Sequence, residues 1–453
     1  MKIIGLDVSK DNVCAHALDR YPAGGLSTYW QKTRKRAKSE YPTFYSVPHP
    51  KKKRKSAWDF LEWVKDVKPH YAVMEPTGHH YSLLWATILQ SLNIPVLWVG
   101  HIELKRYREG KNLPGKGKND AIDALAMAAY PHDPEHLLES EEFNPRAFLM
   151  VRCDRVNRLR ELCQDLNHLA RVQHPIVAHL KQCLSWQFPE VQQLRSQSSK
   201  YAPPLYGWLA NREDLCSRRG WTRIVKKHER SIARELDLEI SPLTRLQAQW
   251  MIDIDEQEKQ IECELRALLD AEEFAPYNQI FDRFGFGLRI RSRLLSRIYP
   301  FESFLTADNR QWIEYELREV KKPERVFTGG VYKVKFNPGD MKRHKRNRSR
   351  DIFKMRLGMG TVLEASGDGW IEKSAGSTIC RESLWQHVFT KVEPDRGPDT
   401  PEFRELVNYR DDLKERKDPS GKPLLNGRHI EGKIMSKTTN LLFKVFVQTF
   451  ARQ

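Results

Sequence analysis

The sequence lacks the features of secreted, disulfide-rich or membrane-spanning proteins. No stretch reaches the about 18 apolar residues of a membrane span, and Asp7 interrupts the only apolar run of MKIIGLDVSK, unlike a signal peptide. The cysteines form no CxxC pair and no Cys/His spacing of the zinc type. We therefore expect reduced thiols in a soluble, cytoplasmic protein that does not bind membranes. The seven cysteines are Cys14, Cys153, Cys163, Cys183, Cys216, Cys263 and Cys380.

Acidic residues are too few to balance the basic ones. The chain has 76 Lys and Arg against 59 Asp and Glu, which gives a formal net charge of +17. Such an excess favours a polyanionic partner, and nucleic acid is the first candidate. An anionic membrane surface is the alternative, but the basic residues are spread through aromatic-rich sequence rather than along one amphipathic helix. The 453 residues suffice for two or three domains.

The first 140 residues alternate between strand and helix patterns. Residues 2–18 read as a β-hairpin, 56–67 as a helix, 71–78 as a buried strand, and the following segments as a helix and a strand. This alternation predicts an α/β domain over residues 1–140. Residues 34–55, rich in proline and charge, are expected to form a surface loop or insertion.

The middle and the end of the chain look mostly helical. Leucines recur at spacings of three and four in residues 141–275, which predicts two long helices paired antiparallel or as a coiled coil; ordinary amphipathic core helices are the alternative. In 276–453, IFDRFGFGLRIRSRLL has the shape of a helix-hairpin-helix, although a plain packing corner would look similar. MKRHKRNRSR (341–350) is expected to be an exposed, mobile basic loop, and the C-terminal segment an amphipathic helix.

Four acidic residues stand where they could meet at one edge of a sheet. Asp7 ends the first strand, Glu75 ends a later one, and Asp120 and Asp123 lie about 60° apart on one face of a predicted helix. Clustered carboxylates repel one another unless a cation neutralises them, and hard oxygen ligands suit Mg²⁺ or Mn²⁺. The alternative is that Asp120 is an ordinary N-terminal helix acid and Asp123 a solvated one.

The motifs GLDVSKDN, EPTG and KNDAIDALAMA, in this order, resemble the DEDD transposases of the insertion sequence 110 family, which includes the Piv-type DNA invertases. The resemblance implies a RuvC-like, RNase H-like domain whose metal ligands are Asp7, Glu75, Asp120 and Asp123. In the second half, EASGDGWIEKSAGSTICRESLW resembles the serine segment of that family, with Cys380 in place of its leucine. The resemblance makes Ser366 the catalytic nucleophile.

The same resemblance implies a DNA recombinase that works with Mg²⁺ or Mn²⁺ and with a structured guide RNA, called a bridge RNA. It also implies a homo-oligomer, because a recombinase must hold two DNA duplexes. Residues expected to contact nucleic acid are Lys116, Lys118, Gly285, Gly287 and Arg381. The expected architecture is a RuvC-like domain (1–140), a helical coiled-coil region (141–275) and a mostly α serine domain with the helix-hairpin-helix (276–453).

Other functions remain open at this stage. The protein could be a site-specific DNA invertase, a RuvC-like metal-dependent nuclease that does not rejoin strands, or a binding protein that has lost catalysis. An ATP-binding actin-like fold also begins with a strand, an Asp and a hairpin, but the further Gly-rich phosphate loops are missing. PKKKRK (50–55) resembles a nuclear localisation signal, yet a lysine run in a nucleic-acid enzyme is more often a phosphate-contacting or solvated loop.

Overall fold

The computed structural model describes most of the chain and divides it into two compact units, Met1–Arg152 and Cys153–Gln453. The described residues are 1–47, 54–76, 80–114, 119–137, 143, 147–149, 154–192, 201–319, 322–328, 331–337, 341–366, 369–417 and 421–451. Only the backbone is described for 37, 38, 80, 318, 319, 322–328, 331–337, 341, 342, 362–366 and 369–373. Each unit is described separately below.

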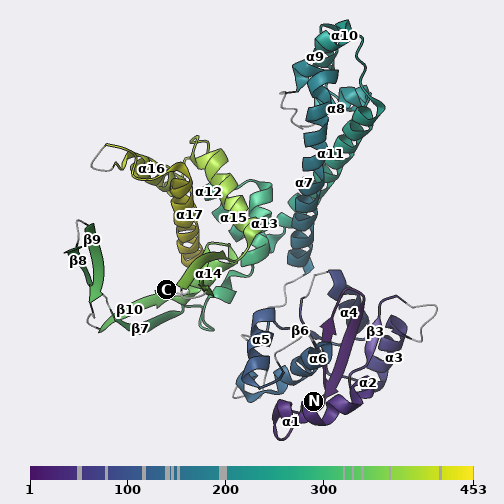
Figure 1. Cartoon of the computed structure of the whole chain (residues 1–453), viewed down its shortest axis with the longest axis vertical. Helices are drawn as coiled ribbons and strands as arrows, with labels where there is room; N and C mark the ends of the chain where they lie inside the picture. Colours follow the sequence, from purple (N-terminus) through teal and green to yellow (C-terminus); the bar gives the residue numbers. More distant parts are fainter. Residues whose placement is uncertain are drawn as a thin grey trace. The chain divides into compact units, whose positions relative to one another are not determined.

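A six-stranded mixed sheet forms the centre of the first unit (Figure 1). Its order is β4-β3-β2-β1-β5-β6. Strands β1 and β2 form the predicted hairpin, and β5 and β6 add to β1 in parallel. The bounds are β1 Ile3–Val8, β2 Asn12–Leu18, β3 Thr43–Tyr45, β4 Lys55–Ser56, β5 Tyr71–Met74 and β6 Val96–Trp98.

Helices cover both faces of this sheet, because alternate residues of β1 point to opposite sides and both sides are apolar. Ile4, Leu6 and Val8 share a core with α3 (Ala57–Val67) and α4 (His80–Ser91). Ile3 shares the other core with α1 (Gly25–Thr33), α5 (His101–Gly110) and α6 (Asp120–Ala129). The predicted α/β layer is thus confirmed.

The segment 34–55, which we expect from the sequence to be a surface loop or insertion, contains regular structure. It contains a short helix, α2 (Ala37–Glu40), and its residues Thr43–Tyr45 form β3, which pairs antiparallel with β2. The side chain of Phe44 is 1% exposed and packs against Phe60 and Trp63. A three-residue strand between charged flanks has too little apolar sequence to be recognised, yet one buried aromatic residue is enough to place it in the core.

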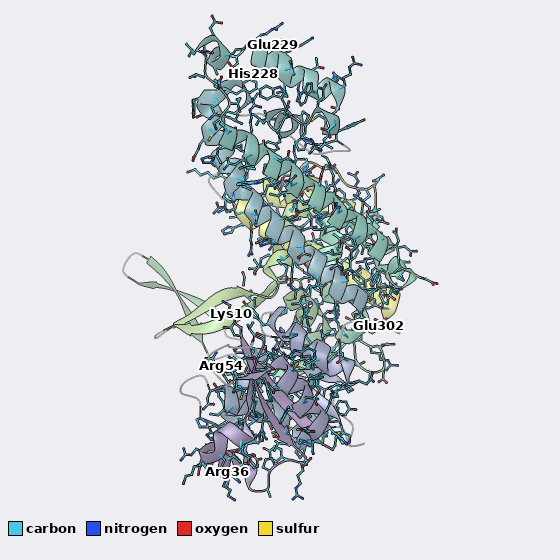
Figure 2. All side chains as sticks on the ribbon, turned by 90° about the vertical axis from the view of Figure 1, so that its right-hand side faces the viewer. Lys10, Arg36, Arg54, His228, Glu229 and Glu302 are labelled. Carbon is cyan, nitrogen blue, oxygen red and sulfur yellow. The ribbon has the colours of Figure 1, made fainter. Side chains whose placement is uncertain are left out.

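Two long antiparallel helices dominate the start of the second unit (Figure 2). They are α7 (Asp154–Gln187) and α11 (Pro242–Leu269). Arg158, near the start of α7, contacts Glu264 near the end of α11, and His179, farther along α7, contacts Gln247 near the start of α11. At their far end lie α8 (Pro204–Leu209), α9 (Arg218–Glu229) and α10 (Ile232–Glu235); Figure 2 labels His228 and Glu229 there. The antiparallel pair is confirmed, whereas a coiled coil stays a prediction.

The rest of the second unit is a helical core with three two-stranded ribbons. Its helices are α12 (Ala275–Phe284), α13 (Leu288–Ile298), α14 (Arg348–Arg356), α15 (Thr378–His387), α16 (Pro401–Glu415) and α17 (Gly427–Phe450). The core contains many phenylalanines: Phe301 stacks on Phe446 with centroids 5.0 Å apart, and Phe353 lies 5.4 Å from Phe443. The predicted C-terminal helix, α17, therefore packs into this core. No helix in the described part of the chain is long and apolar enough to cross a membrane.

The ribbons correct a second expectation. We predicted a mobile basic loop at 341–350, but Met341–Asn347 form β10, which pairs antiparallel with β7 (Ile313–Glu319), and α14 follows directly. β7 supplies acids to this segment: Glu316 lies 3.6 Å from Arg346 of β10, and Glu314 pairs with Arg348 at the start of α14. The other ribbons are β8 (Lys322–Thr328) with β9 (Val331–Asn337), and β11 (Gly360–Ser366) with β12 (Gly369–Ala375). Figure 1 shows the β7–β10 ribbon projecting from the side of α14, with the β8–β9 ribbon at its far end.

Candidate active site

Asp7 and Glu75 stand next to each other at the ends of two parallel strands. Leu6 on β1 pairs with Met74 on β5, so the next residue on each strand is Asp7 and Glu75. Neighbouring strands lie about 4.8 Å apart, and both residues belong to the face covered by α6. Asp7 is 5% exposed, and the Glu75 side chain is 14% exposed. The sheet therefore brings together two acids that are 68 positions apart in the sequence.

Gly5 allows α6 to lie directly on this face of β1. A Cβ atom at Gly5 would lie 2.1 Å from the carbonyl oxygen of Ala124 and 2.3 Å from the backbone nitrogen of Ala128, so only glycine permits this approach. Asp120 precedes Ala124 by about one helical turn. The close packing of helix on strand thus fixes where the first turn of α6, with its two aspartates, lies relative to Asp7.

The pKa of the Cys14 thiol is affected by the charges of these aspartates. It lies opposite Asp7 in the β1–β2 ladder and is buried. Burial, followed by the negative charges of Asp7, Asp120 and Asp123, raises the pKa of the Cys14 thiol to about 12. All three aspartates therefore lie close enough for their charges to act on this one buried thiol. Sequence reasoning missed Cys14, and its position opposite Asp7 in the predicted hairpin was the available signal.

Asp123 is a buried residue with a specific partner. It is 8% exposed and forms an ion pair with Arg108, whose Nη1 donates to its carboxylate. The alternative that Asp123 is an ordinary solvated helix acid is therefore wrong. Arg108 comes from α5 and was not foreseen, because nothing in its spacing indicates which acid it will meet. Asn119 caps α6 by accepting a hydrogen bond from the backbone N–H of Ala121.

Glu75 has a neighbour on α5 as well. His101 Nδ1 lies 3.5 Å from Glu75 Oε2, and the imidazole is 82% exposed. His101 and Arg108 thus belong to one helix and approach two of the four predicted metal ligands. Helix α5 carries basic groups to this edge of the sheet, so it can balance the acids when no cation does.

The donor set suits a hard divalent cation. All four predicted ligands are carboxylates, the oxygen donors that Mg²⁺ and Mn²⁺ prefer, and negative charge is concentrated enough to affect Cys14. Among the described residues, no three His, Cys, Asp or Glu side chains are already spaced as ligands. Arg108 occupies one oxygen of Asp123. A cation would have to compete with this guanidinium for Asp123, so the metal site stays a prediction.

The predicted serine lies in the second unit, at the end of a hairpin strand. Ser366 is the last residue of β11 and pairs with Gly369 of β12, and the description of Ser366 is limited to its backbone. The nearby Gly376 has φ 97°, and a Cβ there would lie 1.8 Å from Met355 O. Ser377 caps α15 by accepting from Cys380 N. The Gly376-Ser377 pair is therefore explained by local structure, whereas the role of Ser366 stays a prediction.

The predicted nucleic-acid contacts have different surroundings. Gly285 has φ 69° and ends α12, but a Cβ there would lie 2.6 Å from Pro398, so the chain itself covers this glycine. Gly287 begins α13 and has open space around it. The Nε of Arg381 is buried without a hydrogen-bond partner. Lys116 and Lys118 lie outside the described residues.

The β7–β10 ribbon presents a cationic and aromatic face. Register places Lys345 opposite Tyr315 and Arg343 opposite Leu317, and all four side chains are exposed. The Arg343 guanidinium lies 4.0 Å from the centre of the Tyr315 ring. Between Ile313 and Leu317 this face of the ribbon carries no acid. A two-stranded ribbon of this kind can enter the major groove of B-DNA.

The opposite face of the ribbon is neutralised by ion pairs. Arg346 lies 3.0 Å from Asp351 and 3.6 Å from Glu316, and Arg348 pairs with Glu314. The cations of Arg346 and Arg348 are therefore already paired with acids, unlike those of Arg343 and Lys345 in the described part of the ribbon.

Comparison with known proteins gives one family match. Residues 43–189, about a third of the chain, match the family model of DEDD transposases of insertion sequence 110. This range includes Glu75, Asp120 and Asp123 and leaves out Asp7 and Ser366. Among solved structures, the RuvC structure from Thermus thermophilus matches with 13% identity and a TM-score of 0.19, covering 28% of this chain and 90% of that one. No curated protein matches.

Proposed function

We propose that the chain is a DNA transposase of the insertion sequence 110 family, whose model residues 43–189 match, and that it cleaves and rejoins DNA strands. The observation that carries the proposal is the placement of Asp7 and Glu75 on neighbouring strands under α6, which carries Asp120 and Asp123; the charges of all three aspartates act on Cys14. The acids come from a first strand, the end of a later strand and a following helix, in the order that the family requires. A RuvC-like, RNase H-like domain is part of this proposal.

The four carboxylates are proposed to hold Mg²⁺ or Mn²⁺. Such an ion, when bound, stabilises the negative charge that develops on a phosphodiester during strand cleavage. Asp7 and Asp123 are buried, so the negative charge of their carboxylates is held in a fixed position. In the absence of a cation, Arg108 balances the charge of Asp123. If a metal ion displaced Arg108, metal binding would break the ion pair between Arg108 and Asp123.

Ser366 is proposed as the nucleophile. Its Oγ forms a bond to phosphorus, its proton passes to a base, and the DNA hydroxyl leaves, so the strand end becomes linked to the protein. Attack by the hydroxyl of a second strand then breaks the serine–phosphorus bond and rejoins DNA. This scheme conserves the bond energy of the phosphodiester and needs no further co-reactant.

A bridge RNA and a homo-oligomer complete the proposal. With an RNA guide, base pairing would select the sequence while the protein holds nucleic-acid backbones through charge, which agrees with the net charge of +17. For the oligomer, support comes from α11, where Leu243, Leu246 and Trp250 recur at helical spacing and are 50%, 48% and 43% exposed. An apolar stripe of this kind is typical of a surface that another protein covers.

The test separates rejoining from simple cleavage. Purified protein is incubated with Mg²⁺, its RNA and labelled DNA ends, and products are resolved under denaturing conditions. The proposal predicts a covalent protein–DNA product that is lost in Ser366→Ala and in Asp7→Asn. If Ser366→Ala still cuts DNA at the parent rate and no covalent product forms, the protein is a RuvC-like nuclease. Inversion of a segment between repeats in place of insertion would identify an invertase.

A further inference from the structure

An arginine cluster lies where α7, α13 and α15 meet in the second unit. Arg293 and Arg297 are one turn apart on α13 and therefore share a side of that helix. Both influence the thiols of Cys163 on α7 and Cys380 on α15, and Cys380 Sγ lies 3.6 Å from the carbonyl oxygen of Arg293. Arg160, one turn before Cys163, completes the group.

Neighbouring arginines on the same helices are neutralised by glutamates. Arg289, one turn before Arg293 on α13, has its Nε 2.7 Å from Glu262 and its Nη2 2.9 Å from Glu258. On α7, the Nε of Arg158 lies 2.6 Å from Glu264. The pairing of arginine with acid is thus the rule where α7 and α13 face α11.

The cluster departs from this rule. In the described part of the chain no carboxylate forms an ion pair with Arg160, Arg293 or Arg297; the partner of Arg293 is the hydroxyl of Ser383, 3.2 Å from its Nη1. The Nε atoms of Arg160 and Arg293 are buried without a hydrogen-bond partner. The same holds for Arg381, which follows Cys380 on α15. Buried Nε donors of three arginines, on α7, α13 and α15, therefore lack an acceptor within the described part of the chain.

Such an arrangement is unfavourable for the protein alone. Burial, followed by the like charges of Arg297 and Arg356, lowers the pKa of Arg160 below its ordinary value. The three arginines are half-buried, and a partly desolvated cation without a counter-charge is unfavourable for a fold, so packing alone does not explain the cluster. An anion would satisfy both the charges and the free N–H donors. Guanidinium groups match phosphate oxygens with two parallel hydrogen bonds, which makes phosphate the best-suited ligand.

We propose that Arg160, Arg293 and Arg297 bind a phosphate of the DNA backbone. This proposal rests on the proposed function for the identity of the ligand, since DNA supplies the phosphates, and it goes beyond that function by locating a contact outside the four carboxylates and Ser366. Arg293 contacts Cys380 and Ser383 of α15, so the phosphate would lie beside the N-terminal half of that helix, whose dipole also favours an anion.

The first test measures thermal unfolding of the full chain in sodium phosphate against sodium chloride at equal ionic strength. The unfolding temperature of the parent should rise with phosphate. Arg160→Gln and Arg297→Gln should unfold no lower than the parent in chloride, because a repulsive charge is gone, and should lose the phosphate response. Arg289→Gln is the matched control: it should unfold lower, because Glu258 and Glu262 lose their partner, and keep the response.

The second test measures binding of a DNA duplex, and of an RNA hairpin as a separate probe, at several salt concentrations. Each cluster variant should bind DNA about tenfold more weakly, with a salt slope reduced by about 1. Equal DNA affinity and salt slope in the parent and the cluster variants would overturn the proposal. An equal rise in unfolding temperature with phosphate in the parent and the cluster variants would overturn it as well. A loss confined to the RNA probe would also overturn it.

The two proposals can fail separately. If the parent cleaves and rejoins DNA while the arginine variants bind DNA normally, only the phosphate site is wrong. If arginine-dependent phosphate and DNA binding is found but no strand cleavage occurs with either metal, the cluster stands and the transposase function is wrong.

Discussion

Cys14 lies directly opposite Asp7 in the β1–β2 ladder, and the two side chains share the face of the sheet that α6 covers. The thiol is buried next to the carboxylate and feels the charges of Asp120 and Asp123 as well. A neutral thiol at the centre of three aspartates is tolerated where a second charged group would not be. This pair therefore gives the acidic centre a measurable reporter.

The first prediction concerns alkaline pH. The folded pKa of Cys14, about 12, lies above the value of 9.0 expected when unfolded. Its contribution to stability is fully present below pH 9 and is lost as pH rises towards 12. The difference in free energy of unfolding between parent and Cys14→Ala should therefore shrink above pH 9, by up to about 1.4 kcal/mol per pH unit. Urea titrations from pH 8 to 11 measure it; Cys263→Ala, at an exposed cysteine, should show no such trend.

A second prediction distinguishes the two aspartates of α6. Both Asp120→Ala and Asp123→Ala should abolish strand joining, with activity reduced by about 100-fold or more. Only Asp123→Ala should also lose stability, on the order of 3 kcal/mol, because Arg108 is left with its charge in a partly buried site. Chemical unfolding and joining assays on the same preparations test this. Normal joining by either variant would contradict the metal site.

The third prediction concerns Gly5. A methyl group in Gly5→Ala would collide with the backbone of α6 and push the helix away, which should cost about 1–3 kcal/mol and move both aspartates from Asp7. Strand cleavage should fall together with the melting temperature. Gly110→Ala is the matched control: nothing lies near its added Cβ at the end of α5, so stability should be unchanged or slightly higher. Full activity in Gly5→Ala would show that the position of α6 does not matter.

A fourth prediction concerns the β7–β10 ribbon. Arg343→Ala combined with Lys345→Ala should weaken duplex binding and reduce the salt slope by about 2, because neither cation is engaged by an acid on its face. Arg346→Ala, on the opposite face and already paired with Asp351, should leave the slope unchanged. Fluorescence anisotropy at several salt concentrations compares them. An equal loss in both would mean that the ribbon contributes only its overall charge.

The fifth prediction concerns acid pH and the core of the second unit. His387 is fully buried, its Nε2 lies 2.8 Å from the carbonyl oxygen of Phe284, and burial lowers the pKa of its imidazole from 6.5 to about 4. The stability due to neutral His387 is present above pH 6.5 and is lost as pH falls to 4, by roughly 3 kcal/mol. The free energies of unfolding of the parent and of His387→Gln, measured at pH 7, 6, 5 and 4, should become more similar as the pH falls. Parallel curves would contradict the buried neutral state.

Much of the first unit could be predicted from local patterns. Alternating apolar runs identified β1, β2 and β5, and the spacing of Asp120 and Asp123 placed both acids in one helical turn. Short or charged strands could not be identified in this way. Strand β3 depends on burial of Phe44, and β10 depends on acids that β7 supplies from about thirty positions earlier.

The sequence by itself determined which chemical groups the protein carries and in what order: four carboxylates, a serine followed by glycine, and an excess of basic residues. It also determined the α/β start and the long helices, because hydrophobic periodicity is a local property. Which of these side chains contact one another depends on the tertiary structure. Arg108 meets Asp123, Cys14 sits among three aspartates, and Arg160, Arg293 and Arg297 meet without an acid. These side-chain contacts depend on how helices pack on strands and on each other, and no local sequence pattern encodes them.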